Sequence, residues 1–185
     1  MHISFNKLKT SVQISQGSNI IEDSLKELYY KLDLNYPKFF KMDNLCKLGV
    51  LGAELLVREN QKILKDKVDI GIILQNKSSS LDTDIKHQAR IDEDSVSPAV
   101  FVYTLPNIVI GEISIKHKWN SEGVFFVDKE IDYELLSQYS NILLKEARTK
   151  LNLIGWVDVF KNQLSLQFCF VESEITTDKL ESLLG

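Results

Sequence analysis

The sequence predicts an α/β protein with an open, mixed sheet of five strands and helices on both faces. Residues 69–74 form an apolar, β-branched run, as expected of a strand that is covered on both faces. Helical patterns separate this run from later apolar runs by distances that permit parallel crossovers. The last two runs, 153–160 and 164–171, are separated by little more than Lys161-Asn162, which predicts a hairpin. The predicted order is therefore β-α-β-α-β-α-β-β, with one antiparallel strand at the edge.

The N-terminal third predicts a short strand and two helices. Residues 2–5 form the strand, and Ser18 is the expected N-cap of a helix that runs through Leu32. Asp43 is the expected N-cap of a longer helix over 44–64. Gly49 and Gly52 in that helix permit close approach to a neighbouring backbone.

Residues 81–95 predict a short exposed helix with an acidic, solvated turn. The spacing of Asp82, Asp84 and Asp92 does not match a calcium loop, which needs alternating ligands, a central Gly and a closing Glu. We therefore expect no metal site there.

The segment 107–118 is ambiguous, because Ile108, Val109 and Ile110 favour a strand. We expect a helix, since a strand here would leave no crossover before the apolar run 124–127. Gly111 is then expected to be the small residue that permits tight packing.

The C-terminal part predicts an amphipathic helix over 133–150, the hairpin, and a short helix that starts at Thr177 or Asp178. Strand 164–171 alternates apolar and polar residues, as expected of an outer strand with one wetter face. The expected apolar stripe of the 133–150 helix consists of Leu135, Leu136, Tyr139, Ile142, Leu143 and Ala147.

Bulk composition indicates an ordinary globular protein, and we expect one domain over residues 1–185. The net charge of −4, with acids and bases interleaved, argues against nucleic-acid binding. No apolar run is long enough to cross a bilayer, and the N-terminus lacks the apolar core of a signal peptide, so we expect a cytoplasmic location without a membrane span. Cys46 and Cys169 are expected to be free, buried thiols.

Several fragments, in their order and spacing, resemble the N-terminal half of the β-ketoacyl synthases (3-oxoacyl-acyl-carrier-protein synthases) of the thiolase superfamily. The resemblance is greatest for the short ketoacyl synthase-like proteins that accompany polyene or flexirubin-type pigment and lipid gene sets. It implies a half-thiolase-like αβα sandwich and a helix begun by Pro106 at a first-turn position. The fragments are Phe40-Lys41-Met42-Asp43, residues 70–80, Ser97-Pro98-Ala99-Val100-Phe101, Leu105-Pro106-Asn107 with Gly111, and Ile154-Gly155-Trp156-Val157-Asp158.

In the active family a cysteine nucleophile follows the second strand at the mouth of a helix, where the helix dipole lowers its pKa. The resemblance places Glu130 or Ile131 at that position, and neither residue forms an acyl thioester. The family's later histidines have no counterpart, and His2, His87 and His117 are scattered without a paired nucleophile. We therefore expect no catalytic residue, and the sequence gives no evidence for a cofactor.

These observations leave three functions open. The first is a non-catalytic ketosynthase-like accessory subunit in acyl-carrier-protein-dependent fatty-acid or polyketide-type synthesis. The second is an acyl-transfer or condensing enzyme completed by a partner chain, and the third is an acyl-chain or small-ligand binding module. Expected partners are a second copy or a full-length ketosynthase, and acyl carrier protein. The resemblance implies dimer pairing through an edge strand, which consists of Val124, Phe125, Phe126 and Val127.

Overall fold

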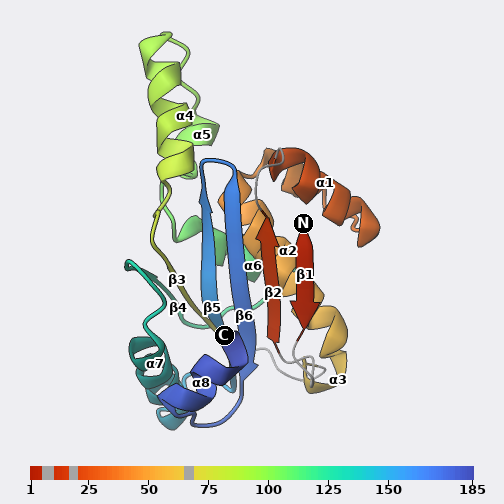
Figure 1. Cartoon of the computed structure of the whole chain (residues 1–185), viewed down its shortest axis with the longest axis vertical. Helices are drawn as coiled ribbons and strands as arrows, with labels where there is room; N and C mark the ends of the chain where they lie inside the picture. The colour runs from red at the N-terminus through yellow and green to blue at the C-terminus, as the bar shows by residue number, and fades with distance from the viewer. Residues whose placement is uncertain (6–10, 17–20, 65–68) are drawn as a thin grey trace.

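The computed structural model describes residues 1–5, 11–16, 21–64 and 69–185, and it shows one mixed sheet between two layers of helices (Figure 1). The strands lie in the order β1-β2-β6-β5-β3-β4. This arrangement confirms the predicted αβα class, with six strands where five were predicted. The described strands are β1 (His2–Phe5), β2 (Ser11–Gln16), β3 (Ile70–Asn76), β4 (Gly123–Val127), β5 (Leu151–Phe160) and β6 (Gln163–Val171).

The sixth strand is β2, which the sequence reading missed. β3 is parallel to β4 and β5, whereas β6 is antiparallel to both β5 and β2, and β1 is antiparallel to β2. The prediction that the last strand lies at the edge is therefore wrong, because β2 covers its outer side. Alternation along a strand reports that one face is wetter, and it does not report whether a further strand pairs alongside.

The two helical layers cover the sheet unequally (Figure 1). One face carries the larger cluster of buried residues and the other a smaller one. The first layer contains α1 (Ile21–Lys31), the 3-10 turn η1 (Pro37–Lys41), α2 (Asn44–Glu59) and α6 (Ile108–His117), and α3 (Gln61–Leu64) follows α2. The second layer contains α7 (Tyr133–Lys145) and α8 (Thr177–Leu184). An arm formed by α4 (Leu81–Asp92) and α5 (Pro98–Val102) projects beyond the sheet.

Helix α2 packs closely against both a helix and the sheet, and its two glycines make this possible. The Asp43 side chain accepts a hydrogen bond from the Cys46 N–H at 2.9 Å, which confirms the predicted N-cap. A Cβ at Gly49 would lie 2.3 Å from Val109 of α6, and one at Gly52 would lie 2.4 Å from Leu166 of β6. Both glycines therefore let α2 pack closely against a neighbour. The helix ends at Glu59, and the predicted extension to Leu64 is the separate turn α3.

Helix α6 confirms the choice of helix over strand for this segment. Pro106 lies just before the N-cap Asn107, and therefore outside the first turn where it was expected. The expectation for Gly111 is wrong, because a Cβ built there would meet no atom within 4 Å. Val109 and Ile113, both fully buried, form the contact face of α6 instead.

Helix α7 is shorter than predicted, and its buried face differs. Leu136, Ser137, Ser140 and Leu143 are buried, whereas Ile142 is 48% exposed. Helix α8 packs along α7, and the Ser137 hydroxyl lies 3.3 Å from the Thr177 hydroxyl, which accounts for a polar residue on the buried face. The Asn141 amide binds the backbone N–H and carbonyl of Ile175, so part of the polar face is satisfied within the chain.

The predictions for the C-terminal helix and for the hairpin turn can be compared with the structure, whereas that for the first N-cap cannot. The predicted N-cap Ser18 lies outside the described residues. α8 begins at Thr177 as predicted, with Thr176 as its N-cap. Positive φ angles of 47° and 60° at Lys161 and Asn162 are typical of the predicted tight hairpin turn. Across the described ranges, no helix has both the length and the apolar character needed to span a membrane.

Candidate functional site

The junction between β4 and α7 lies where parallel strands end, the edge of an α/β sheet at which sites commonly form. The chain leaves β4 at Val127 and enters α7 at Tyr133. Asp132 is the N-cap of α7, and its carboxylate accepts a hydrogen bond from the Leu135 N–H at 2.8 Å. Glu130 and Ile131 therefore lie directly before a capped helix N-terminus.

The end of β3 holds this junction in place. The Asp128 N–H donates to the Asn76 carbonyl at 2.8 Å, and the Asp132 N–H donates to Oε1 of Gln75 at 2.8 Å. Gln75 is fully buried, and its Nε2 group has no hydrogen-bond partner among the described residues. A buried amide nitrogen without a partner is uncommon, so the junction keeps an unused NH2 donor group.

A cavity of about 570 Å³ lies beside the junction, within the range of small-molecule sites. Glu130 and Ile131 both line it, so these predicted positions face open space and not a filled turn. Trp156 of β5 also lines it and donates from Nε1 to the Ser165 hydroxyl at 3.0 Å. The lining residues are Lys77, Lys129, Glu130, Ile131, Tyr133, Trp156, Gln167 and Glu181.

The lining of this cavity contains neither a thiol nor an imidazole. Tyr133 is the only hydroxyl-bearing side chain among these eight residues, and burial raises the pKa of its phenol, with a further contribution from Glu181. A raised pKa makes the phenolate less accessible at neutral pH. The cavity therefore offers space and charge but no activated nucleophile.

Both cysteines are free and buried, as the sequence predicted. Cys46 lies in the first turn of α2, and Cys169 lies in β6 under α7 and α8. Burial raises the pKa of each thiol far above its usual range, and Asp43 adds to the effect at Cys46. Neither sulfur lines the cavity at the β4–α7 junction, and neither environment favours a thiolate.

The histidines are dispersed, as predicted, and none lines this cavity. His2 lies in β1, and His87 contacts Phe101 in the arm with a ring separation of 5.6 Å. His117 stacks on Trp119 at 4.8 Å, and burial lowers its pKa to about 4. A histidine with this pKa is neutral at pH 7. The His117 side chain is only 8% exposed.

The three aspartates considered for a metal site are all in α4 and engage neighbouring side chains. Asp82 pairs with Lys86 at 2.7 Å, Asp84 accepts from the Ser80 hydroxyl, and Asp92 accepts from Gln88. Among described residues, no group of three His, Cys, Asp or Glu side chains is arranged to hold a metal ion.

The expected pairing strand, β4, lies at one edge of the sheet beside β3. Phe126 packs on Tyr139 of α7, whereas Phe125 packs against the larger core on the other face. Val127 is 54% exposed. Glu122 and Asp128 bond to β3 through their backbones, so the alternate residues Phe125 and Val127 direct their backbone groups away from β3.

The sequence reading missed Gln75, Lys77 and Trp156 as site residues. Gln75 directly follows the apolar run of β3, and a polar residue near the carboxyl end of a parallel strand was the available signal. Trp156 gave no such signal, because its strand reads as ordinary core. Its position in the cavity depends on the order of the strands.

Comparisons with known proteins identify the fold. No family model and no curated protein matches the sequence. Solved structures do match, and the sheet with its two helical layers is the thiolase-like fold of the β-ketoacyl synthases, at partial length. At 11–16% identity, these matches define the fold alone.

Three of these structures show how much of the fold is present. A type II PKS acyl-carrier protein in complex with its ketosynthase bound to the hexaketide matches with TM-score 0.66 and 11% identity, over 89% of this chain and 61% of that chain. The ishigamide ketosynthase/chain length factor matches with TM-score 0.63 and 16% identity, over 72% of this chain and 44% of that chain. A ketosynthase in complex with its chain length factor from Xenorhabdus doucetiae matches with TM-score 0.58 and 13% identity, over 94% of this chain and 79% of that chain. This chain thus spans about half the length of the first two.

Proposed function

We propose that this chain is a ketosynthase-like accessory subunit without catalytic activity of its own. It assembles with a full-length ketosynthase in acyl-carrier-protein-dependent synthesis of a fatty-acid or polyketide-type product, such as a pigment or polyene lipid. The fold supports this proposal, as do the similar structures in which a ketosynthase is in complex with a chain length factor or an acyl-carrier protein. The observation that carries it is the β4–α7 junction, which holds Glu130 and Ile131 where the family resemblance expects the nucleophile.

Acyl transfer in this family requires a thiolate at a helix N-terminus. At the β4–α7 junction the capped helix is present but the sulfur is not, and both thiols of the chain are enclosed elsewhere. A carboxylate at Glu130 cannot replace a thiol as the carrier of an acyl thioester. The scaffold therefore supports binding and assembly better than catalysis.

Co-purification tests the proposed partnership. The tagged chain is mixed with full-length ketosynthases and acyl carrier proteins from its own source, and complexes are measured by size exclusion with light scattering. We expect a defined heteromer with one ketosynthase. If the chain associates with none of the ketosynthases and none of the carrier proteins, the proposal is wrong.

Thioester labelling separates this role from the enzyme alternative. Incubation with acyl thioesters, with and without the partner, is followed by intact-mass measurement. We expect no acyl adduct on Cys46 or Cys169, because both sulfurs are buried. A stable adduct on either residue would favour an acyl-transfer enzyme completed by a partner.

The β4 edge provides a second test of assembly, through Val127→Pro. Proline removes an outward backbone N–H while leaving the alternate bonds to β3 in place. We expect the purified variant to fold normally. Its affinity in dimer or heteromer formation should fall by about tenfold or more, because each lost edge hydrogen bond also leaves a group of the partner unpaired. Val127→Thr, which keeps the N–H, is the matched control. Unchanged association of Val127→Pro would exclude β4 pairing.

A further inference from the structure

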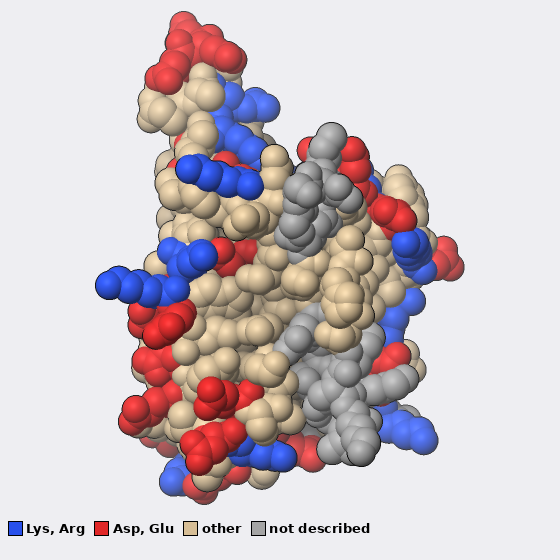
Figure 2. All heavy atoms as spheres, viewed as in Figure 1, with Lys and Arg blue, Asp and Glu red and all other residues tan. Residues whose placement is uncertain are grey.

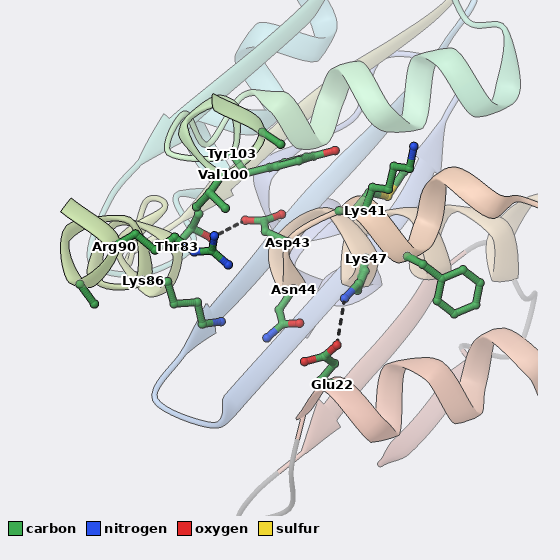
Figure 3. A pocket seen from close by; sticks show the side chains of 14 residues that line it. Glu22, Lys41, Asp43, Asn44, Lys47, Thr83, Lys86, Arg90, Val100 and Tyr103 are labelled. Carbon is green, nitrogen blue, oxygen red and sulfur yellow. Dashed lines mark hydrogen bonds and ion pairs between the residues drawn. The ribbon is translucent and has the colours of Figure 1, made fainter. Parts of the chain in front are cut away.

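A second cavity, of about 480 Å³, lies between the helices of the first layer and the arm (Figure 3). It shares no lining residue with the cavity at the β4–α7 junction. Residues from α1, η1, α2, α4 and α5 line it, so the arm meets helices that lie about 40 residues or more earlier in the sequence. Its volume is within the range of small-molecule sites.

Four cationic side chains line this cavity, on a chain whose net charge is −4. Lys47 is only 5% exposed, and its ion pair with Glu22 is 3.7 Å long, beyond direct hydrogen-bond distance. Lys41 and Arg90 form no ion pair within the described part of the chain, and Lys86 pairs only with Asp82 of its own helix. A buried ammonium without a close acceptor is costly, and burial accordingly lowers the pKa of Lys47.

Two carboxylates also line the cavity, but each already has other partners. Asp43 accepts hydrogen bonds from the Cys46 N–H and from the Thr83 hydroxyl, the latter at 2.7 Å. Glu22 pairs with Lys26 at 3.0 Å in addition to its long contact with Lys47. Cationic groups are therefore in excess over the acids. The first turn of α2 adds the partial positive charge of a helix N-terminus.

Apolar side chains form another part of the lining. Met42 and Tyr103 are buried, and Val100 lies beside them. The Tyr103 hydroxyl donates to Glu112 at 3.0 Å, so the ring and not the hydroxyl lines the cavity. Figure 3 shows the ammonium groups of Lys47 and Lys86 on one side and Val100 and Tyr103 on the other.

We propose that this cavity binds a small anionic amphiphile. Its carboxylate or phosphate group contacts Lys47, Lys86 and Arg90, and its apolar chain lies against Met42, Val100 and Tyr103. This binding site is independent of the proposed partnership, because it uses neither β4 nor the β4–α7 junction. Its test requires only this chain.

Isothermal titration calorimetry with four probes tests whether binding requires both the anionic head group and the apolar tail. Decanoate and decyl phosphate carry the tail with either anionic head, decanol carries the tail alone, and inorganic phosphate carries the charge alone. We expect saturable binding of at least one of the two amphiphiles, with decanol and inorganic phosphate weaker by about tenfold or more. The preference between decanoate and decyl phosphate identifies a carboxylate or a phosphate ester as the natural head group. Equal binding of decanol, or no binding of either amphiphile, would overturn the proposal.

Two variants locate the site. Lys47→Met removes the buried charge at similar length, and we expect about tenfold weaker binding. Ala99→Trp fills the cavity while keeping every cation, and we expect it to abolish binding. Lys145→Met, on the far side of the sheet, is the control and should bind as the unmodified chain does. Full affinity in both folded cavity variants would show that the amphiphile binds elsewhere.

Discussion

The two faces of the sheet differ in how completely they are buried. Among described residues, the α1/α2/α6 face has a continuous cluster of thirty-one buried side chains, whereas the α7/α8 face has eight. Uncharged residues cover the centre of the second face and charged residues gather around its rim, as Figure 2 shows. Trp156 and Gln167 lie there, beside the cavity at the β4–α7 junction. One face therefore supplies most of the folding free energy, and the other carries the candidate site.

Truncation of a core leucine on each face gives the largest expected effect. Leu51→Ala in α2 should lower the free energy of unfolding by about 2–5 kcal/mol, because it leaves a cavity at a fully buried position. Leu180→Ala in α8 should loosen mainly the second layer. Chemical denaturation measures the global loss, and hydrogen exchange reports which strands lose protection.

The comparison predicts that Leu180→Ala leaves β5 and β6 protected, while Leu51→Ala weakens protection across the sheet. Equal loss of protection in both variants would show that the smaller cluster is as important to the fold as the larger one.

A smaller expected effect concerns the stability of the protein at acid pH, and it arises from His117 of α6, on the first face. Burial depresses the folded-state pKa of His117 to about 4, below its unfolded value of about 6.5. The unfolded chain therefore binds the proton more readily, and stability is lost as pH falls from about 6.5 to 4. The loss from this residue is on the order of 3 kcal/mol at pH 4.

His117→Phe keeps a ring on Trp119 and removes the titration. We expect its stability to depend less steeply on pH than that of the unmodified chain over the same window, as measured by urea denaturation. Parallel pH profiles would show that His117 is not the group responsible. Glu54 and Lys116, the neighbouring charges, remain in both proteins.

Two glycine substitutions give the smallest pair of effects, with opposite signs. Gly52→Ala should cost about 1–3 kcal/mol, because its Cβ would overlap Leu166. Gly111→Ala should stabilise by about 0.5–1 kcal/mol, because the position is helical and open. Thermal denaturation distinguishes them. Stabilisation by both substitutions would mean that α2 and β6 are less closely packed than the structure indicates.

Most local features could be predicted from the sequence. The Asp43 cap, the buried β3, the helical state of residues 108–117 and the 161–162 turn follow from short-range chemistry. The errors concern contacts between distant segments, because hydropathy cannot show which neighbour covers a residue. Gly111 was expected to pack and faces open space, and Ile142 was expected to be buried and is exposed. Likewise β6 was placed at the edge, because nothing in its own sequence indicates that β2 pairs with it.

The same distinction between local chemistry and long-range contacts applies to the candidate site. The sequence by itself determined that neither cysteine follows the 124–127 strand, and that Glu130 and Ile131 occupy the approach to the next helix. Only the tertiary structure placed Lys77, Trp156 and Glu181 around those residues, and only it assembled Lys47, Lys86 and Arg90 from two helices into one cavity. The physical reason is that residue chemistry is local, whereas a cavity is made by strand order and helix packing, which bring together segments far apart in the chain.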